Sequence, residues 1–155
     1  MTPKSLYATF ALGEAITWTL LIAALIVRGV TGLAPIVTIA GAVHGFVFLA
    51  YGAAAVLLAV NQRWHPGVAV LAIGSAVIPY ATIPVERWLA RTGRLAGVWR
   101  RETTGDPRDH GWLDRLVRWF IRHPVLLIVA IFAAVAVLFV VLLLLGPPQL
   151  PGQSG

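Results

Sequence analysis

The stretch that decides the fold runs from Pro124 to Leu145 and reads PVLLIVAIFAAVAVLFVVLLLL, without one charged, amide or hydroxyl side chain. At about 1.5 Å per residue, a helix of this length extends about 33 Å, enough to cross a bilayer core of about 30 Å. It is flanked by Arg122-His123 on one side and by Gly146-Pro147-Pro148 on the other. The sequence therefore predicts an integral membrane protein.

The composition of the whole chain agrees with a membrane location. Of its 155 residues, 59% are hydrophobic and only 12% are charged, about half the charged fraction of a soluble domain. Cysteine is absent, which excludes disulfides and thiolate metal sites. The net charge of +6 is explained by topology, because Lys and Arg collect in cytoplasmic loops. We therefore expect no nucleic-acid partner.

Three further apolar segments precede this stretch, at residues 6–27, 36–60 and 67–88. A cleaved signal peptide is disfavoured for the first, because Glu14 would interrupt its apolar core. We expect an all-α, four-span transmembrane bundle. In it, residues 1–90 form a three-helix polar core, residues 124–146 add an apolar anchor span, and residues 147–155 form a short tail.

The basic residues predict the orientation of these spans. Nine of the twelve Lys and Arg residues lie between Arg87 and Arg122, in the loop expected to join spans three and four. Because cytoplasmic loops are enriched in Lys and Arg, residues 89–122 are expected to be cytoplasmic. With four spans, both termini would then lie outside.

The loop of residues 91–123 contains one amphipathic segment, at residues 112–122. On a helix, Arg115, Arg118 and Arg122 share one side with Asp114, and Trp, Leu, Val, Phe and Ile residues fill the rest. This pattern is typical of an interfacial helix. Its arginines could face anionic lipid at the cytoplasmic surface, although ordinary anchoring of a basic loop explains the same pattern.

Glu14 is the most informative polar residue within a span. An acidic side chain near the centre of a membrane helix costs roughly 2.5–3.5 kcal/mol. Glu14 must therefore face protein or water, be paired, or be protonated. Counting helical rise from opposite membrane faces places His44 within about 6 Å of its depth, and Tyr51 shares the His44 face. We expect an intramembrane polar site of Glu14, His44 and Tyr51, with a purely structural pair as the alternative.

Small residues mark the packing face of the second span. Gly41, Gly45 and Gly52 share a stripe with His44. Small residues at this spacing let membrane helices approach closely. We therefore expect these glycines to mediate helix packing.

The third segment carries a second candidate site, and its prolines loosen the helix. Pro79, and Pro84 after it, each remove a backbone donor. Broken backbone beside polar side chains can bind a ligand, and it can equally be an ordinary kink. The candidate residues are Ser75, Pro79, Tyr80, Thr82 and Glu86.

Three separated motifs also resemble a known family. They are Gly13-Glu14-Ala15, then His44-Gly45 with Tyr51, and then Pro79-Tyr80-Ala81-Thr82 ending in Glu86-Arg87. Over residues 5–90 they resemble the YdzA-like family of small bacterial integral membrane proteins of unknown function. Ala15 departs from the pattern, which more usually has Gly after the Glu. The resemblance implies a multi-pass protein of the bacterial plasma (inner) membrane, and it implies no activity.

Two classes of function fit these features. The first is a non-enzymatic accessory or scaffold protein that binds a membrane-protein partner, with lipid at its basic loop. The second is a small transporter or an ion- or proton-coupled carrier, working as a homo-oligomer, that uses Glu14 and His44. An enzyme is disfavoured, because no nucleophile stands with a base in a recognisable order. No cofactor and no metal site are expected.

Overall fold

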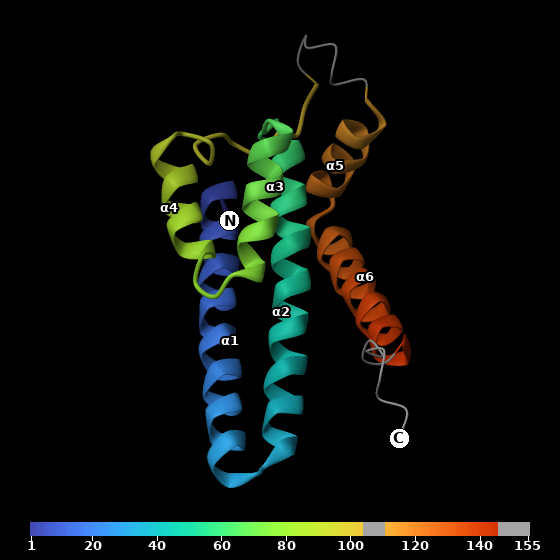
Figure 1. Ribbon diagram of the computed structural model, residues 1–155. Coiled ribbons are helices and arrows are strands. Elements are labelled where there is room, and N and C mark those ends of the chain that lie inside the picture. Colours follow the sequence, from blue (N-terminus) through green and yellow to red (C-terminus); the bar gives the residue numbers. More distant parts are fainter. Residues whose placement is uncertain (104–110, 146–155) are drawn as a thin grey trace.

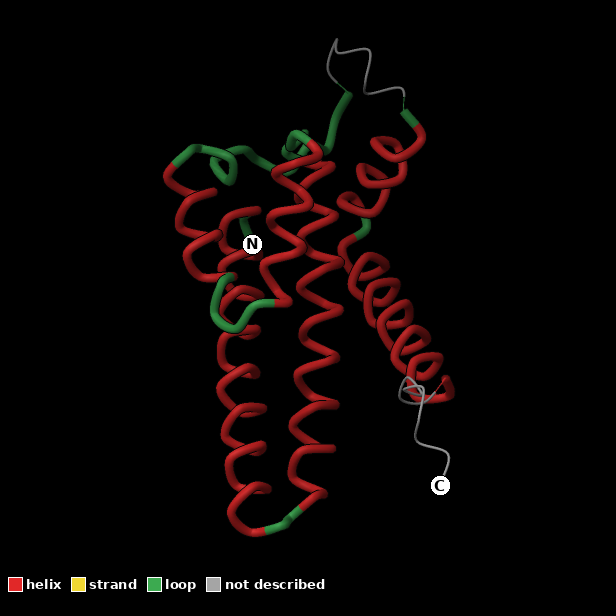
Figure 2. The backbone as a smooth tube through the Cα atoms, in the orientation of Figure 1, coloured by secondary structure: helices red, strands yellow, loops and turns green. Residues whose placement is uncertain are grey.

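The structure is a computed structural model that describes residues 1–103 and 111–145. Its regular elements are helices throughout this part of the chain (Figures 1 and 2), as the sequence predicts. Their bounds are α1 Pro3–Thr31, α2 Ala34–Asn61, α3 Pro66–Gly74, the 3-10 helix η1 Ser75–Val77, α4 Thr82–Arg91, α5 Trp112–Arg122 and α6 Pro124–Leu145.

The two longest helices, α1 and α2, form an antiparallel hairpin. Helix α1 starts at a capping box between Thr2 and Ser5 and ends at Gly32, whose φ of 75° closes it with a left-handed cap. With 29 and 28 residues, both helices exceed the length needed to cross a bilayer. Their contact face is rich in buried alanines, including Ala11, Ala15 and Ala55, so the two backbones pack closely.

The expected third span over residues 67–88 is wrong, because this segment folds back on itself. Helix α3 and η1 together cover only 12 residues, Pro66–Val77, or about 18 Å, which is roughly half a bilayer core. The chain then turns, and α4 runs back beside α3 toward the end where α3 began (Figure 1). Residues 66–91 therefore form a helical hairpin that turns back partway along α1 and α2, which we call the re-entrant hairpin.

Pro79 explains why the helix breaks where it does. A residue before proline is pushed out of the helical region, and Ile78 is extended, with φ −102° and ψ 124°. Tyr80 then takes a left-handed conformation, with φ 64°, which is uncommon for a residue with a side chain. Pro84 falls in the first turn of α4, where a missing N–H is tolerated.

Since the third segment does not cross, the N-terminus lies at the same end of the molecule as the basic loop. The Trp99 indole donates a hydrogen bond to the Met1 carbonyl oxygen at 2.8 Å. The first residues also share a cleft of about 330 Å³ with Leu95–Trp99. The expected arrangement, with the N-terminus on the face opposite residues 89–122, is therefore wrong. The end of α6 lies toward the opposite end of the bundle (Figure 1).

The count of spans changes accordingly. Within the described residues, α1 and α2 are long and apolar enough to cross a membrane. A third candidate is the pair of α5 and α6, whose segments Trp112–Arg122 and Val125–Leu138 meet at 114°. Helix α5 has the bounds expected for the interfacial helix, whereas its place at the membrane surface stays a prediction.

A polar clamp fixes the start of the basic loop on α2. Asn61, which is 2% exposed, donates to the Val98 carbonyl oxygen and accepts from the Arg100 backbone N–H. The Arg100 guanidinium donates to the Val60 and Asn61 carbonyl oxygens and to Asp114 of α5, each at 2.6 Å. One loop residue thus ties the end of α2 to α5.

Two of the three glycines that were expected to mediate packing on α2 leave room for a side chain. A Cβ added at Gly41 would reach only the Leu21 side chain, at 4.0 Å, and one at Gly52 would meet nothing within 4 Å. A packing role of Gly45 stays a prediction.

Cysteine labelling distinguishes the re-entrant hairpin from a crossing helix, and the native chain has no cysteine to interfere. We expect Lys4→Cys and Thr92→Cys to react with an impermeant thiol reagent from the same face of the membrane. Val30→Cys, 81% exposed beside the α1–α2 turn in the native chain, should react from the other face. Labelling of residues 4 and 92 from opposite faces would restore a crossing third span.

Removing the clamp should loosen the loop. Asn61→Leu keeps the volume but leaves the Arg100 N–H and the Val98 oxygen without these partners, at a cost of about 1–2 kcal/mol. The open population, and with it the rate of tryptic cleavage after Arg100 or Arg101, should rise about 5–30-fold. Thr92→Val, which alters a bond within α4, is the control and should leave this rate unchanged.

Candidate functional site

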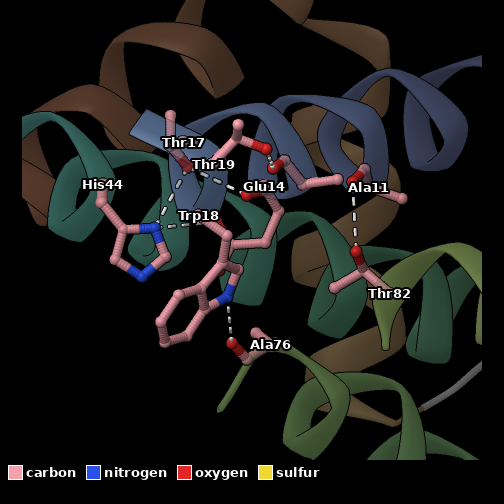
Figure 3. A network of polar contacts seen from close by, with 9 residues as sticks. Ala11, Glu14, Thr17, Trp18, Thr19, His44, Ala76 and Thr82 are labelled. Carbon is pink, nitrogen blue, oxygen red and sulfur yellow. Dashed lines mark hydrogen bonds and ion pairs between the residues drawn. The ribbon is translucent and has the colours of Figure 1, made fainter. Parts of the chain in front are cut away.

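The tip of the re-entrant hairpin is built from side chains that satisfy its free backbone groups. A helix that stops inside a membrane leaves carbonyl oxygens without partners. The Ala72 oxygen accepts from the hydroxyls of Tyr51 and Ser75, each at 2.7 Å. The Ala76 oxygen accepts from the Trp18 indole at 3.1 Å (Figure 3). Polar groups on α1 and α2 therefore hold the broken end of α3.

The start of α4 is held on α1 in the same way. The buried Thr82 hydroxyl donates to the Ala11 carbonyl oxygen at 3.1 Å (Figure 3). The Thr19 and Tyr80 hydroxyls lie 3.3 Å apart. The tip is thus fixed along two turns of α1, and Glu14 lies between these contacts.

Tyr51 hydrogen-bonds to residues at the hairpin tip and not to the Glu14 carboxyl group. Its hydroxyl lies 2.5 Å from the Tyr7 hydroxyl and 3.0 Å from the Ser75 hydroxyl. Tyr7 and Tyr51 are both fully buried, with ring centroids 5.5 Å apart. This tyrosine pair therefore fills the core next to the last turn of α3, where Tyr51 bonds Ala72.

The structure brings Glu14 and His44 together, as the depth estimate predicts. Glu14 is 0% exposed, and its Oε2 lies 3.9 Å from His44 Nδ1. In the part of the chain that the structure describes, neither Glu14 carboxyl oxygen has a hydrogen-bond partner. A buried polar group without a partner is costly, so this carboxyl group has an unmet requirement for a proton or a donor.

Thr17 and Trp18 complete the surroundings of His44. The Thr17 hydroxyl donates to the Glu14 carbonyl oxygen at 3.1 Å and lies 3.1 Å from His44 Nδ1. The Trp18 ring packs on the imidazole with centroids 4.5 Å apart (Figure 3). An aromatic face of this kind favours a cationic partner. The site can therefore accommodate a charged or a neutral His44.

The other predicted residues are distributed more widely. Ser75, Tyr80 and Thr82 hold the tip, whereas Pro79 shapes the turn and Glu86 is half-buried on α4. They lie on a turn and two helices, so they do not share one helix face.

The basic face of α5 needs one correction. Arg115 and Arg122 are exposed, as expected for residues that meet lipid headgroups. Arg118 is only 6% exposed, so it is buried in protein and does not face lipid. The helical pattern alone does not reveal this burial.

An apolar cavity of about 490 Å³ lies between α2, η1 and α6, with Phe120 of α5 at its edge. Small residues shape it, because Gly52 and Ala53 face Ala130 and Ala134. Among the described residues, no group of three or more His, Asp and Glu side chains could hold a metal ion.

Sequence reasoning missed Tyr7, Thr17 and Trp18 as partners of the site. All three lie on the Glu14 side of α1, since positions 7, 14, 17 and 18 repeat at helical spacing. That shared face was the available signal. The contacts themselves depend on where the hairpin tip packs.

Comparison with known proteins supports an uncharacterised membrane-protein family. The family described as "Domain of unknown function (DUF3817)" matches residues 4–91. The chain is also 34% identical over 103 residues to a Streptomyces coelicolor protein named "Putative membrane protein SCO5905". This match covers 65% of the chain and 12% of the relative, so the chain spans about an eighth of that protein. No solved structure matches the chain.

Removing the Tyr51 hydroxyl should weaken the attachment of the tip. Tyr51→Phe deprives the Tyr7 hydroxyl of its partner and Ala72 of one donor. We expect a loss of about 1–2 kcal/mol in the free energy of unfolding, measured by denaturation in mixed micelles. Thr9→Val, which removes an exposed hydroxyl that bonds the Ser5 carbonyl oxygen within α1, is the control and should stay within about 0.5 kcal/mol of the native protein. Equal losses from both variants would contradict this role of Tyr51.

Proposed function

Because the chain belongs to the family described as "Domain of unknown function (DUF3817)", which assigns no activity, we propose a non-enzymatic accessory function. In this proposal the chain is a membrane module that assembles with a larger membrane protein. The observation that carries it is the match to a segment amounting to 12% of a much longer membrane protein. A module that matches one segment of a larger membrane protein is expected to pack against the rest of such a protein.

Fusion and separate assembly differ in effective concentration. Linking two modules makes their contact intramolecular, so even a weak interface is occupied. In either arrangement the module must offer a surface to the rest of the assembly. The proposal therefore requires a partner surface on the described helices.

The half of the α1–α2 hairpin next to its turn offers such a surface. The re-entrant hairpin covers only the other half (Figure 1), and a shallow apolar groove of about 310 Å³ remains between α1 and α2. Its small residues, Ala23, Ala24 and Ala40, alternate with larger ones such as Ile39. Small residues at a helix interface allow another membrane helix to approach closely. We assign this groove to a helix of the partner.

Charge supports an orientation for the module. In the part of the chain that the structure describes, every Lys and Arg except Arg28 lies in the half that carries the N-terminus. Because cytoplasmic segments are enriched in these residues, we assign the N-terminus and the basic loop to the cytoplasm. With three crossings, the end of α6 is then outside. The YdzA-like resemblance and the bacterial relative support the plasma membrane of a bacterium.

Helix α5 fits the cytoplasmic surface in this orientation. Its apolar residues Trp112, Leu116 and Trp119 are 67%, 43% and 48% exposed, as expected for a helix that lies in the membrane interface. The side chains of Arg115 and Arg122 are exposed. We assign them to anionic lipid headgroups, with an attraction of about 1 kcal/mol for each arginine.

The proposal is tested by dividing the relative. SCO5905 without the segment that matches this chain is co-expressed with that segment as a separate chain, and the pair is purified in nanodiscs for native mass spectrometry. We expect the two pieces to assemble, and this chain to replace the segment. Pieces that are folded but purify separately would overturn the proposal.

A pair of variants tests the groove. Ala23→Trp fills the groove and should abolish the assembly of this chain with the divided relative. Val125→Trp changes a position on α6 that is 71% exposed and should leave assembly intact. Assembly that survives Ala23→Trp would show that the partner does not use the groove.

One observation favours a second candidate function. The buried Glu14 carboxyl group without a hydrogen-bond partner is costly if its role is only structural. It is the kind of group that a proton-coupled carrier uses. Flux of a solute or proton in vesicles that contain only this chain would favour the carrier over the accessory function.

A further inference from the structure

The charge balance around Glu14 defines what the site can bind. Glu14 is completely buried, and in the described part of the chain its ion-pair partner is His44, at 3.9 Å. A lone buried carboxylate would carry one negative charge in a medium that penalises it strongly. One added proton makes the pair neutral overall, whether the proton sits on the carboxyl group or on the imidazole.

The other titratable groups on the elements around Glu14 do not supply that charge. On α1 and α2 the phenol groups are Tyr7 and Tyr51, which hydrogen-bond to each other. The turn contributes Tyr80 and α4 contributes Glu86. The cationic side chains on these elements are Lys4 and Arg28 on α1 and Arg87 and Arg91 on α4. Among the described residues, Glu14 forms its ion pair with His44 and with none of these four. The positive charge required by Glu14 must therefore come from a proton held within the pair.

Counting hydrogens at Thr17 shows how the proton can be held. The Thr17 hydroxyl has one hydrogen, and when it donates this hydrogen to the Glu14 carbonyl oxygen, its oxygen can accept from a protonated His44 Nδ1. Nδ1 then carries a hydrogen and faces both Thr17 and the Glu14 carboxylate. When the proton moves to the Glu14 carboxyl group, Nδ1 becomes the acceptor. The proton passes from nitrogen to oxygen, and the pair stays neutral.

His44 is the member of the pair that can exchange this proton with the surroundings. Its side chain keeps 11% exposure, whereas that of Glu14 keeps none. The Trp18 ring lies beside the imidazole, with centroids 4.5 Å apart and a tilt of 54°, and an aromatic ring at this distance attracts a cation. Because histidine changes charge readily near neutral pH, it is suited to pass a proton inward.

We propose that Glu14 and His44 form a one-proton binding site inside the membrane, which is loaded and unloaded through His44 and positioned by Thr17. The ligand is the proton itself. This inference goes beyond the accessory function and does not depend on it, since it rests on the geometry of the pair alone.

Infrared spectroscopy of the full chain in nanodiscs tests the proposal, because a protonated carboxylic acid has its own carbonyl band. We expect a band that titrates with pH, is lost in Glu14→Gln and remains in Glu86→Gln. Hydrogen–deuterium exchange of this band should be slowed in His44→Phe, which keeps an aromatic ring but removes the relay. If Glu14→Gln fails to fold, a shift of the band in Glu14→Asp assigns it instead.

Two matched threonine variants separate the positioning role from a general packing effect. Thr17→Val should shift the band and its titration, whereas Thr19→Val, which also lies on α1 but bonds Ala15 and Tyr80, should shift neither. A band that does not titrate, or that exchanges equally fast in His44→Phe, would overturn the proposal. A titration that depends on Na⁺ at constant ionic strength would also overturn it, because the ligand would then be a metal cation.

Discussion

The structure depends on one constraint, which is that a helix that ends inside a bilayer must have its free carbonyl groups satisfied by protein. Helix α3 ends at this depth, and hydroxyl and indole groups from α1 and α2 donate to Ala72 and Ala76. Without these donors the tip would expose polar backbone to hydrocarbon, at a cost of several kcal/mol for each group. The buried polar residues of the first two helices are thus explained first as the receptor for the hairpin tip.

Most of these polar residues are accounted for by the tip, and the exception is informative. Tyr51, Trp18 and Thr82 each bond a backbone oxygen of a neighbouring element. Glu14 lies among them and bonds none in the described part of the chain. A residue that is costly to bury and does not support the fold is a better candidate for function than one that does. For this reason we base the proton site on Glu14 and the stability of the fold on its neighbours.

The sequence predicts some levels of this structure and not others, for physical reasons. Apolar length and the absence of charge predict α1, α2 and α6, because those properties set whether a helix can span a bilayer. The same properties do not separate a crossing segment from a re-entrant one, and residues 67–88 were misassigned for that reason. The available signal was Pro79, which limits the helix from Pro66 to 12 residues before the break. Segments of 10–14 apolar residues are too short to cross.

The candidate site could also be predicted only in part from the sequence. Depth arguments bring Glu14 and His44 together, because helical rise is regular and both helices are continuous. They cannot place Tyr51 in the tip or bury Arg118, since those positions depend on how α3 and α5 pack on α2. The predicted side of the N-terminus was wrong because it was counted back from the basic loop through three crossings. One crossing too many places the N-terminus on the opposite side of the membrane.

The most direct test of the re-entrant hairpin is a distance across it. Spin labels at Val70→Cys on α3 and Arg87→Cys on α4 can be measured by pulsed electron resonance in nanodiscs. A continuous helix separates these positions by about 25 Å along its axis. The packing of α4 beside α3 predicts a clearly shorter distance with a narrow distribution. A distance at or above about 25 Å would show that the segment crosses the membrane, and the account of the tip and of the site beside it would fail.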